Sequence, residues 1–247
     1  RYGLTDEVWR RMSATVAALN YKNAAKNPLA HVQNGPQTAE AILGLPDSGK
    51  GSNMMIAAPL RLHDCSLVTD GAAAVVITTT ENAKATKKKV VEIAGIGHAV
   101  EHLPLSQREN KWELSAGKAA VAKAFQEASI TSKDIDIAEV HDCFSINQIL
   151  TTEALGLSAD GKAGFDYVNG RFGPDDAQVS INLSGGLKAK GHPVGATGAS
   201  MHALVYKQLM EEPIGLAPTK KTPKVGVTFN VGGSGVSNAV TVLRRVK

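Results

Sequence analysis

The feature that most constrains the fold of this chain is a regular alternation of expected strands and helices after residue 90. Segments rich in β-branched residues alternate with amphipathic segments of helical length. The expected strands are residues 90–100, 135–142, 224–231 and 237–245, and the expected helices are residues 116–128, 147–157 and 197–210. Strands that alternate with helices of this length predict a layered α/β domain.

Composition excludes several classes of protein. The chain has 247 residues, of which 43% are hydrophobic and 20% charged, an ordinary globular balance that allows one large or two modest domains. Aromatic residues make up 4%, too few for a platform on which nucleic-acid bases could stack. The net charge is +4, and lysines cluster at residues 84–89 and 220–224. We interpret these clusters as solvated faces, with attraction of an anionic, phosphate-bearing substrate as the alternative.

Cysteine content and targeting signals indicate the cellular compartment in which the protein is expected. Cys65 and Cys143 are the two cysteines, and their spacing matches neither a metal site nor a disulfide framework. We therefore expect a reducing compartment, no metal and no permanently bound cofactor. No apolar run is long enough to span a membrane, and no leader pattern or peroxisomal C-terminal signal is visible. A cytoplasmic location is the prediction, with peroxisome or mitochondrion as the alternatives.

A glycine-rich stretch at residues 181–200 carries the strongest chemical signal. Five glycines fall within residues 185–198, and His192 stands between Gly191 and Pro193. Such a histidine lies on a turn of restricted geometry, directly before the small, apolar start of an expected helix. This position suits general acid/base chemistry, and a purely structural histidine is the alternative.

The N-terminal third is less regular. Residues 1–60 are expected to be irregular and partly helical, since Trp9, Met12, Val16 and Leu19 follow helical spacing. Residues 67–79, LVTDGAAAVVITT, fit a strand that is buried on both faces. The charged residues 84–89 form a connector and a candidate domain boundary.

The motif GGLKAKGHPVGATG resembles the signature of the thiolase superfamily, in the form carried by sterol-carrier-protein-2-type and archaeal thiolases. HDCF at 141–144, NVGGSG at 230–235 and DGAAAVVI at 70–77 also resemble thiolase motifs. The resemblance implies an α/β thiolase fold (layered α-β-α), specifically its C-terminal half with part of the loop domain. The implied domains are 1–64 as a late loop-domain segment, 65–85 as the returning strand of the N-terminal domain, and 86–247 as the C-terminal domain.

The resemblance also implies a chemistry. Thiolases make or break a carbon–carbon bond beside a thioester carbonyl, with coenzyme A thioesters as substrates. His192 matches the histidine that promotes thiolate formation and donates to the enolate oxyanion. His141 matches a residue that holds a water in the same oxyanion hole. The backbone N–H of Gly232 matches a donor to the oxyanion of the acyl-enzyme.

Cys143 is the expected acid/base for the α-proton, with a buried inert thiol as the alternative. Asn230 occupies the position at which many thiolases carry that cysteine, and asparagine exchanges no proton near neutral pH. Phe144 is expected to line the substrate pocket, although an ordinary core phenylalanine fits the pattern equally well. Together with Phe144, the expected substrate-binding residues are Gly185, Gly186 and Asn230.

The expected nucleophile is a cysteine outside this chain. Cys65 precedes the expected strand and has no activation pattern beyond His63. A thiolase N-terminal sheet cannot close from residues 65–80 alone, so we expect an N-terminal half elsewhere, as a partner polypeptide or as a further stretch of the same protein. We also expect a dimer or tetramer of thiolase units. The alternatives are a non-catalytic thiolase-like scaffold and a carbon-acyltransferase that uses an acceptor other than coenzyme A.

Overall fold

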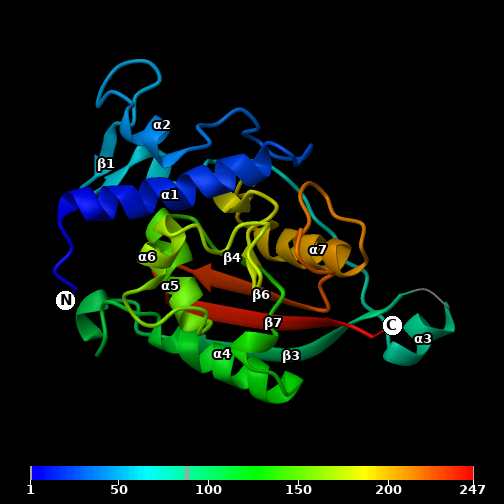
Figure 1. Cartoon of the computed structure of the whole chain (residues 1–247). Coiled ribbons are helices and arrows are strands. Elements are labelled where there is room, and N and C mark those ends of the chain that lie inside the picture. Colours follow the sequence, from blue (N-terminus) through cyan, green and yellow to red (C-terminus); the bar gives the residue numbers. More distant parts are fainter. Residues whose placement is uncertain (1, 87–88, 247) are drawn as a thin grey trace.

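A five-stranded mixed sheet forms the centre of the computed structural model, which describes residues 2–86 and 89–246 (Figure 1). The strands of this sheet, in the spatial order β3-β7-β6-β4-β5, are β3 (Val91–Val100), β7 (Ser237–Arg245), β6 (Val225–Gly232), β4 (Ile137–Val140) and β5 (Ser180–Ile181). β7 pairs antiparallel with β3 and β6, whereas β4 pairs parallel with β5 and β6. The carboxyl ends of β4 and β6 therefore lie at the same edge of the sheet.

Helices cover both faces of this sheet. α4 (Ser115–Ala128) and α5 (Ser145–Ala154) pack on one face, and α7 (Thr197–Leu209) packs on the other. β4 is buried on both sides: Ala138 and Val140 belong to the core with α4 and α5, and Ile137 belongs to the core with α7. The layered α/β prediction is confirmed.

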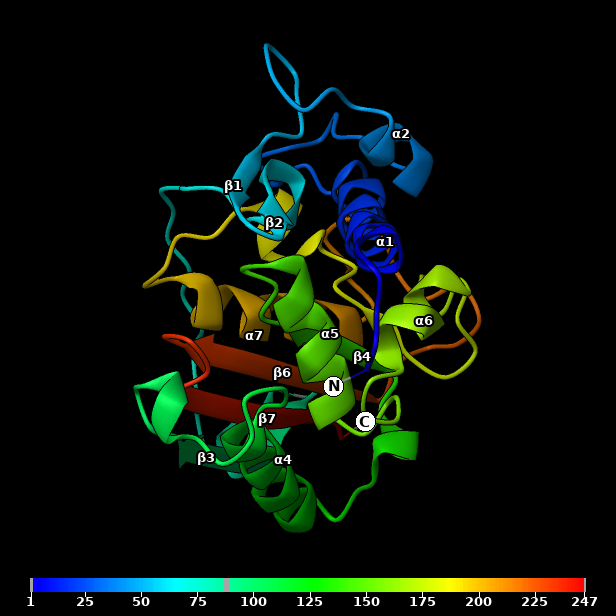
Figure 2. The ribbon, with the colours of Figure 1, turned by 90° about the vertical axis from the view of Figure 1, so that its left-hand side faces the viewer.

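The N-terminal segment forms a cap over one end of this domain (Figure 2). α1 (Asp6–Ala24) packs on α5, on α6 (Ala163–Val168) and on the glycine-rich loop. The helix begins at an N-cap, Thr5, whose hydroxyl accepts the Val8 N–H. The remaining elements before residue 90 are α2 (Ala39–Leu43), the β1 (Met55–Ala57) and β2 (Leu60–Arg61) pair, the 3-10 turn Leu62–Asp64, and α3 (Thr80–Ala85). None of the helices within the described ranges is both long and apolar enough to cross a membrane.

Two glycines of β3 allow α4 to lie directly on the sheet. A Cβ at Gly97 would lie 1.8 Å from the Ala120 carbonyl oxygen, and a Cβ at Gly95 would lie 2.2 Å from the Ala124 carbonyl oxygen. Ala120 and Ala124 present the matching small side chains of α4, and both are fully buried. Close packing between backbones therefore fixes the position of α4.

We expect Gly97→Ala to lower the free energy of unfolding by about 3 kcal/mol, because the added methyl collides with backbone atoms that cannot rotate away. Urea denaturation of both proteins measures the difference. Gly195→Ala is the matched control, since a Cβ there meets no atom within 4 Å. Equal stability of the Gly97 variant and the parent would contradict the close packing.

The strand expected at residues 67–79 does not form in this chain. Apart from one bridge at Val68, residues 66–79 have no strand assignment, and Val68, Val76 and Ile77 are 99%, 98% and 72% exposed. β-branched composition favours a strand, but a strand needs neighbouring backbones to pair with, and the described residues supply none here. The expected connector 84–89 overlaps α3, and its residues 87–88 lie outside the described ranges.

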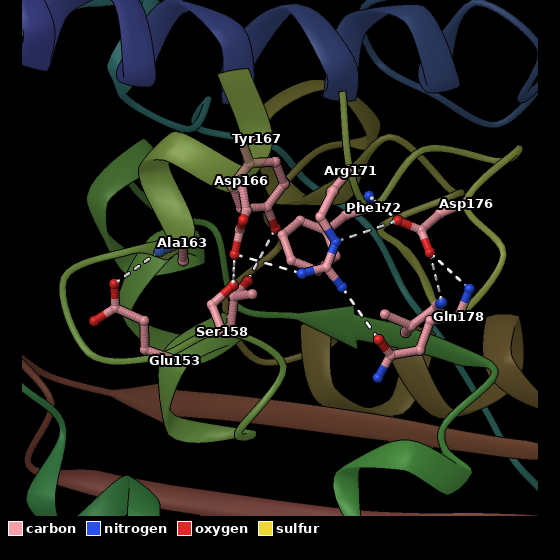
Figure 3. Close-up of polar contacts among 11 residues, drawn as sticks. Glu153, Ser158, Ala163, Asp166, Tyr167, Arg171, Phe172, Asp176 and Gln178 are labelled. Atoms are coloured by element: carbon pink, nitrogen blue, oxygen red, sulfur yellow. Dashed lines mark hydrogen bonds and ion pairs between the residues drawn. The ribbon is translucent and has the colours of Figure 1, made fainter. Parts of the chain in front are cut away.

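The sequence pattern did not predict two elements between residues 158 and 181, which are α6 (Ala163–Val168) and β5. Turn-forming residues dominate this region, and polar contacts order it (Figure 3). Arg171 donates to Gln178, forms ion pairs with Asp166 and Asp176, and lies 4.7 Å from the centre of the Phe172 ring. Such contacts between side chains leave no periodic signal in a sequence.

Candidate active site

The expected site residues of the HDCF motif follow the carboxyl end of β4. The His141 N–H donates to the Phe229 carbonyl at 3.0 Å, which extends the pairing with β6 by one residue. α5 begins four residues after His141, with Phe144 at its N-cap position. His141 is buried, Cys143 is partly buried and Phe144 is exposed. The motif therefore lies at the edge of the sheet where α/β folds commonly place functional groups.

The glycine-rich loop reaches the same edge from the other direction. Gly185, Gly186 and Gly191 have φ values of 98°, 57° and 120°, in the region that favours glycine. Between them the chain forms one π-helical turn, Gly186–Lys190. His192 follows this turn by two residues and lies five residues before the first residue of α7.

His141 and His192 lie side by side. Their ring centroids are 5.0 Å apart and their planes are nearly perpendicular, at 89°. The Asn230 side chain, near the end of β6, lies close enough to the His141 ring to influence its pKa. Nδ1 of His141 is buried and has no partner among the described residues. Three motifs that are far apart in the sequence thus meet at one point.

Thr197 determines the proton position on His192. The Thr197 hydroxyl lies 2.8 Å from Nδ1 of His192 and 3.0 Å from the Pro193 carbonyl oxygen. A carbonyl oxygen only accepts, so the single hydroxyl proton points to Pro193 and the hydroxyl accepts the Nδ1–H of His192. Nε2 of His192 therefore carries the lone pair and is the atom that can take a proton.

Burial keeps both histidines neutral. It lowers the pKa of His141 to about 4, and the neighbouring His192 and Lys190 add to this effect, whereas Asn230 opposes it. Burial also lowers the pKa of His192, with a further contribution from the positive charge of Lys190. Neutral imidazole is the form that accepts a proton, so His192 is a competent base at neutral pH.

Cys143 has the opposite property. Burial raises the pKa of its thiol to about 11, and the negative charge of Asp142 adds to the rise. The thiol consequently carries its proton at neutral pH, which is the form that can donate. Cys143 is thus unsuited to act as an unassisted nucleophile and suited to act as an acid.

An unexpected segment lies against both motifs. Cys65 forms an antiparallel bridge with Phe144, and Val68 forms a parallel bridge with His192. The Ser66 N–H donates to the Cys143 carbonyl at 2.8 Å. Sequence separation hid this proximity of Cys65 to the site. Burial raises the pKa of the Cys65 thiol, although the charge of Lys188 opposes the rise, and its Sγ donates to the Arg61 carbonyl at 3.3 Å.

The glycines expected to bind substrate have a packing role in this structure. Gly185 and Gly186 are buried, and a Cβ on them would lie 2.5 Å from the Ala24 Cβ and 2.4 Å from Asp142 Oδ2, respectively. Their contact with a substrate stays a prediction. Gly232 is exposed at the end of β6, at the same edge as His141.

An open groove adjoins His192. Its volume is about 450 Å³, and its walls come from the exposed segment after Val68 and from the turn after His192. The lining residues are Thr69, Asp70, Gly71, Ala72, Ala73, Pro193, Val194, Gly195 and Ala196. Within residues 2–86 and 89–246, no group of three or more His, Cys, Asp or Glu side chains is arranged to hold a metal ion.

Sequence reasoning missed Asp142, Thr197 and Asn20. Asp142 stands inside the HDCF motif, so its position between two candidate site residues was the available signal. Thr197 was treated as the start of a helix, and Asn20 as part of an amphipathic helix. Their roles depend on partners 5 to 122 residues away, which no local pattern reveals.

Fold and site together define a layered α/β protein with two neutral histidines and a protonated thiol at the carboxyl edge of its parallel strands. Residues 97–245 match the family described as thiolase C-terminal domain-like. The chain therefore belongs to the thiolase family, as the resemblance implied.

Relatives are longer than this chain. An acetyl-CoA acetyltransferase of Methanothermobacter thermautotrophicus is 37% identical over 244 residues, which cover 99% of this chain and 60% of that protein. Sterol carrier protein 2 of Oryctolagus cuniculus is 32% identical over 234 residues, 91% of this chain and 40% of that protein. A solved Ltp2-ChsH2(DUF35) aldolase shares the fold with a TM-score of 0.80 at 20% identity, over 99% of this chain and 59% of that one. The chain thus spans about 60% or less of the proteins it resembles.

Proposed function

We propose that this chain forms the C-terminal part of a thiolase-type acyltransferase that acts on coenzyme A thioesters. The observation that carries the proposal is the contact between the His141 and His192 rings at one edge of the sheet, where Cys143 follows His141 by two residues. The unprotonated Nε2 inferred for His192 and the raised pKa of the Cys143 thiol support it. Membership of the family and the similarity to acetyl-CoA acetyltransferases support it.

In the proposed acyl transfer, Nε2 of His192 takes the proton of a cysteine thiol supplied from outside this chain. The resulting thiolate attacks the thioester carbonyl, the carbon–sulfur bond to coenzyme A breaks, and coenzyme A leaves as a thiol after protonation. The N–H of Gly232 stabilises the oxyanion of this step.

In the proposed carbon–carbon step, the Cys143 thiol first releases its proton to solvent, and the resulting thiolate takes an α-proton from a second acyl-CoA. The enolate oxygen accepts from Nε2–H of His192, which now carries the proton, and from a water held by His141. The carbanion attacks the acyl-enzyme carbonyl and expels the cysteine thiolate, which leaves a 3-ketoacyl-CoA. In the reverse, thiolytic direction, the Cys143 thiol returns its proton to the departing enolate.

An N-terminal half, on a partner polypeptide or elsewhere in the same protein, is part of this proposal. Three observations support it: the exposed apolar residues Val68, Val76 and Ile77, the open groove beside His192, and the greater length of the relatives. The solved aldolase is named as an assembly with a DUF35 protein. Residues 67–79 would become the predicted strand when the partner supplies neighbouring backbones. The oligomeric state and the cytoplasmic location stay predictions.

The isolated chain should remain unmodified by acetyl-CoA, because both of its thiols have raised pKa values and the nucleophile lies elsewhere. Intact-mass spectrometry after incubation with acetyl-CoA tests this. The complex with the N-terminal half should gain one acetyl group, on the partner. A stable adduct on Cys65 or Cys143 of the isolated chain would place the nucleophile here instead, and a complex that neither acylates nor turns over would favour the scaffold alternative.

A further inference from the structure

One buried carboxylate joins the two halves of the candidate site. Asp142 is 1% exposed and stands between His141 and Cys143. Its Oδ1 accepts the Leu187 N–H at 2.6 Å, and its Oδ2 accepts the Lys188 N–H at 3.0 Å. Both donors belong to the glycine-rich loop that leads to His192, so Asp142 fastens the HDCF motif to that loop.

A third donor comes from the N-terminal segment. Asn20 Nδ2, on α1, donates to Asp142 Oδ2 at 2.8 Å and to Gln148 Oε1 at 2.7 Å. Gln148 Nε2 donates in turn to the Tyr167 hydroxyl at 3.0 Å. Asn20 and Gln148 are fully buried and Tyr167 nearly so. Buried networks of this kind hold their members in one arrangement, because every displaced group would lose a hydrogen bond without gaining water.

The loop is shaped for this carboxylate. Gly186 approaches Asp142 so closely that a Cβ would lie 2.4 Å from Oδ2, and the backbone of Gly186 adopts φ 57°. Lys188, in the same loop, also binds the segment that hydrogen-bonds to the backbone of Cys143. Lys188 Nζ donates to the Cys65 carbonyl at 2.5 Å, and the adjacent Ser66 N–H donates to the Cys143 carbonyl.

We propose that Asp142 is a positioning residue: its carboxylate holds His141 and Cys143 in register with the glycine-rich loop and thereby with His192. The catalytic roles of His141, Cys143 and His192 rest on the proposed function, whereas the hydrogen bonds that Asp142 accepts from the loop do not. Asp142 also acts on Cys143 through its negative charge, which opposes ionisation of the thiol. Lys188, Lys190 and Glu139 are charged groups that interact with Asp142 in turn.

Alkylation of Cys143 tests this proposal without any need for turnover. In a Cys65→Ser background, the rate of modification by iodoacetamide is followed by mass spectrometry across a range of pH. Asp142→Asn removes the negative charge beside the Cys143 thiol and places an amide N–H opposite the donors from which Asp142 now accepts. Because that negative charge opposes ionisation, we expect the Cys143 thiol of the variant to ionise at lower pH. Each unit of lowered thiol pKa raises the thiolate fraction tenfold but weakens its nucleophilicity, so we expect a net rise of about threefold or more near pH 8.

Glu153→Gln is the matched control. Glu153 lies on α5 and, like Asp142, is a buried carboxylate that accepts a backbone N–H, in its case from Ala163 at 3.1 Å (Figure 3). We expect its alkylation profile to match that of the parent, even where it lowers stability. An Asp142→Asn profile equal to the parent's, or an equal shift in both variants, would overturn the proposal. An inactive wild-type complex would defeat the proposed function and leave this measurement intact.

Asn20→Ala provides a second route in case Asp142→Asn does not fold. This variant keeps the carboxylate and removes one of its three donors. We expect a smaller rise in the alkylation rate of Cys143, about twofold, since loosened packing exposes the thiol. An unchanged rate in Asn20→Ala would overturn the proposal when Asp142→Asn cannot be measured.

Discussion

Replacement of His192 by alanine should lower turnover of the reconstituted enzyme by about a thousandfold or more, because one side chain serves two steps. Its Nε2 is the proposed base for the partner's nucleophile and then a donor to the enolate oxygen. Acetylation of the partner by acetyl-CoA, followed by mass spectrometry, should fall together with turnover. A variant that acetylates its partner at the wild-type rate would contradict the assignment of the base.

His202→Ala is the matched control for this experiment. His202 lies on α7, one turn beyond the start of the helix, and its Nδ1 lies 2.8 Å from the Gly198 carbonyl oxygen. It belongs to the same helix but lies outside the proposed catalytic apparatus. We expect its turnover to remain within a few-fold of wild type, so a large loss in both variants would indicate damage to α7 rather than loss of a base.

Replacement of Cys143 by alanine should lower turnover by about a hundred- to ten-thousandfold, the usual contribution of a general acid or base. Transfer of the α-proton needs a group that titrates. Asn230 does not, and the Ser145 hydroxyl is too weak an acid. The variant should still acetylate the partner, because the acylation step does not use Cys143. Exchange of the α-protons of acetyl-CoA with deuterated solvent should be lost.

Cys65→Ala provides the comparison for Cys143→Ala. The two cysteines lie on adjacent segments, both partly buried, and burial raises the pKa of both thiols. We expect turnover and exchange to be nearly unchanged in Cys65→Ala. An active complex that is indifferent to Cys143→Ala would keep the acyltransferase assignment and reject the proposed proton shuttle.

Local sequence pattern determined most of the α/β domain. The strands at 90–100 and 237–245 and the helix at 116–128 were predicted within one residue of β3, β7 and α4, because apolar periodicity depends only on neighbours in the chain. Motif resemblance determined the family and the residues His141, Cys143 and His192. Their chemical roles are still to be tested by the experiments above.

Only the tertiary structure decided what those residues contact. Residues 67–79 have the composition of a strand, yet they remain without strand neighbours, because pairing requires backbones from elsewhere. The sequence shows Asp142 only as a member of a motif, whereas the structure shows the three groups that donate hydrogen bonds to it. Thr197 sets which ring nitrogen of His192 carries the proton, through a contact across a turn. Burial then decides that the Cys143 thiol keeps its proton and that the His141 ring stays neutral. Periodicity records which face of a segment is buried, whereas hydrogen-bond partners and desolvation arise between segments that only folding brings together.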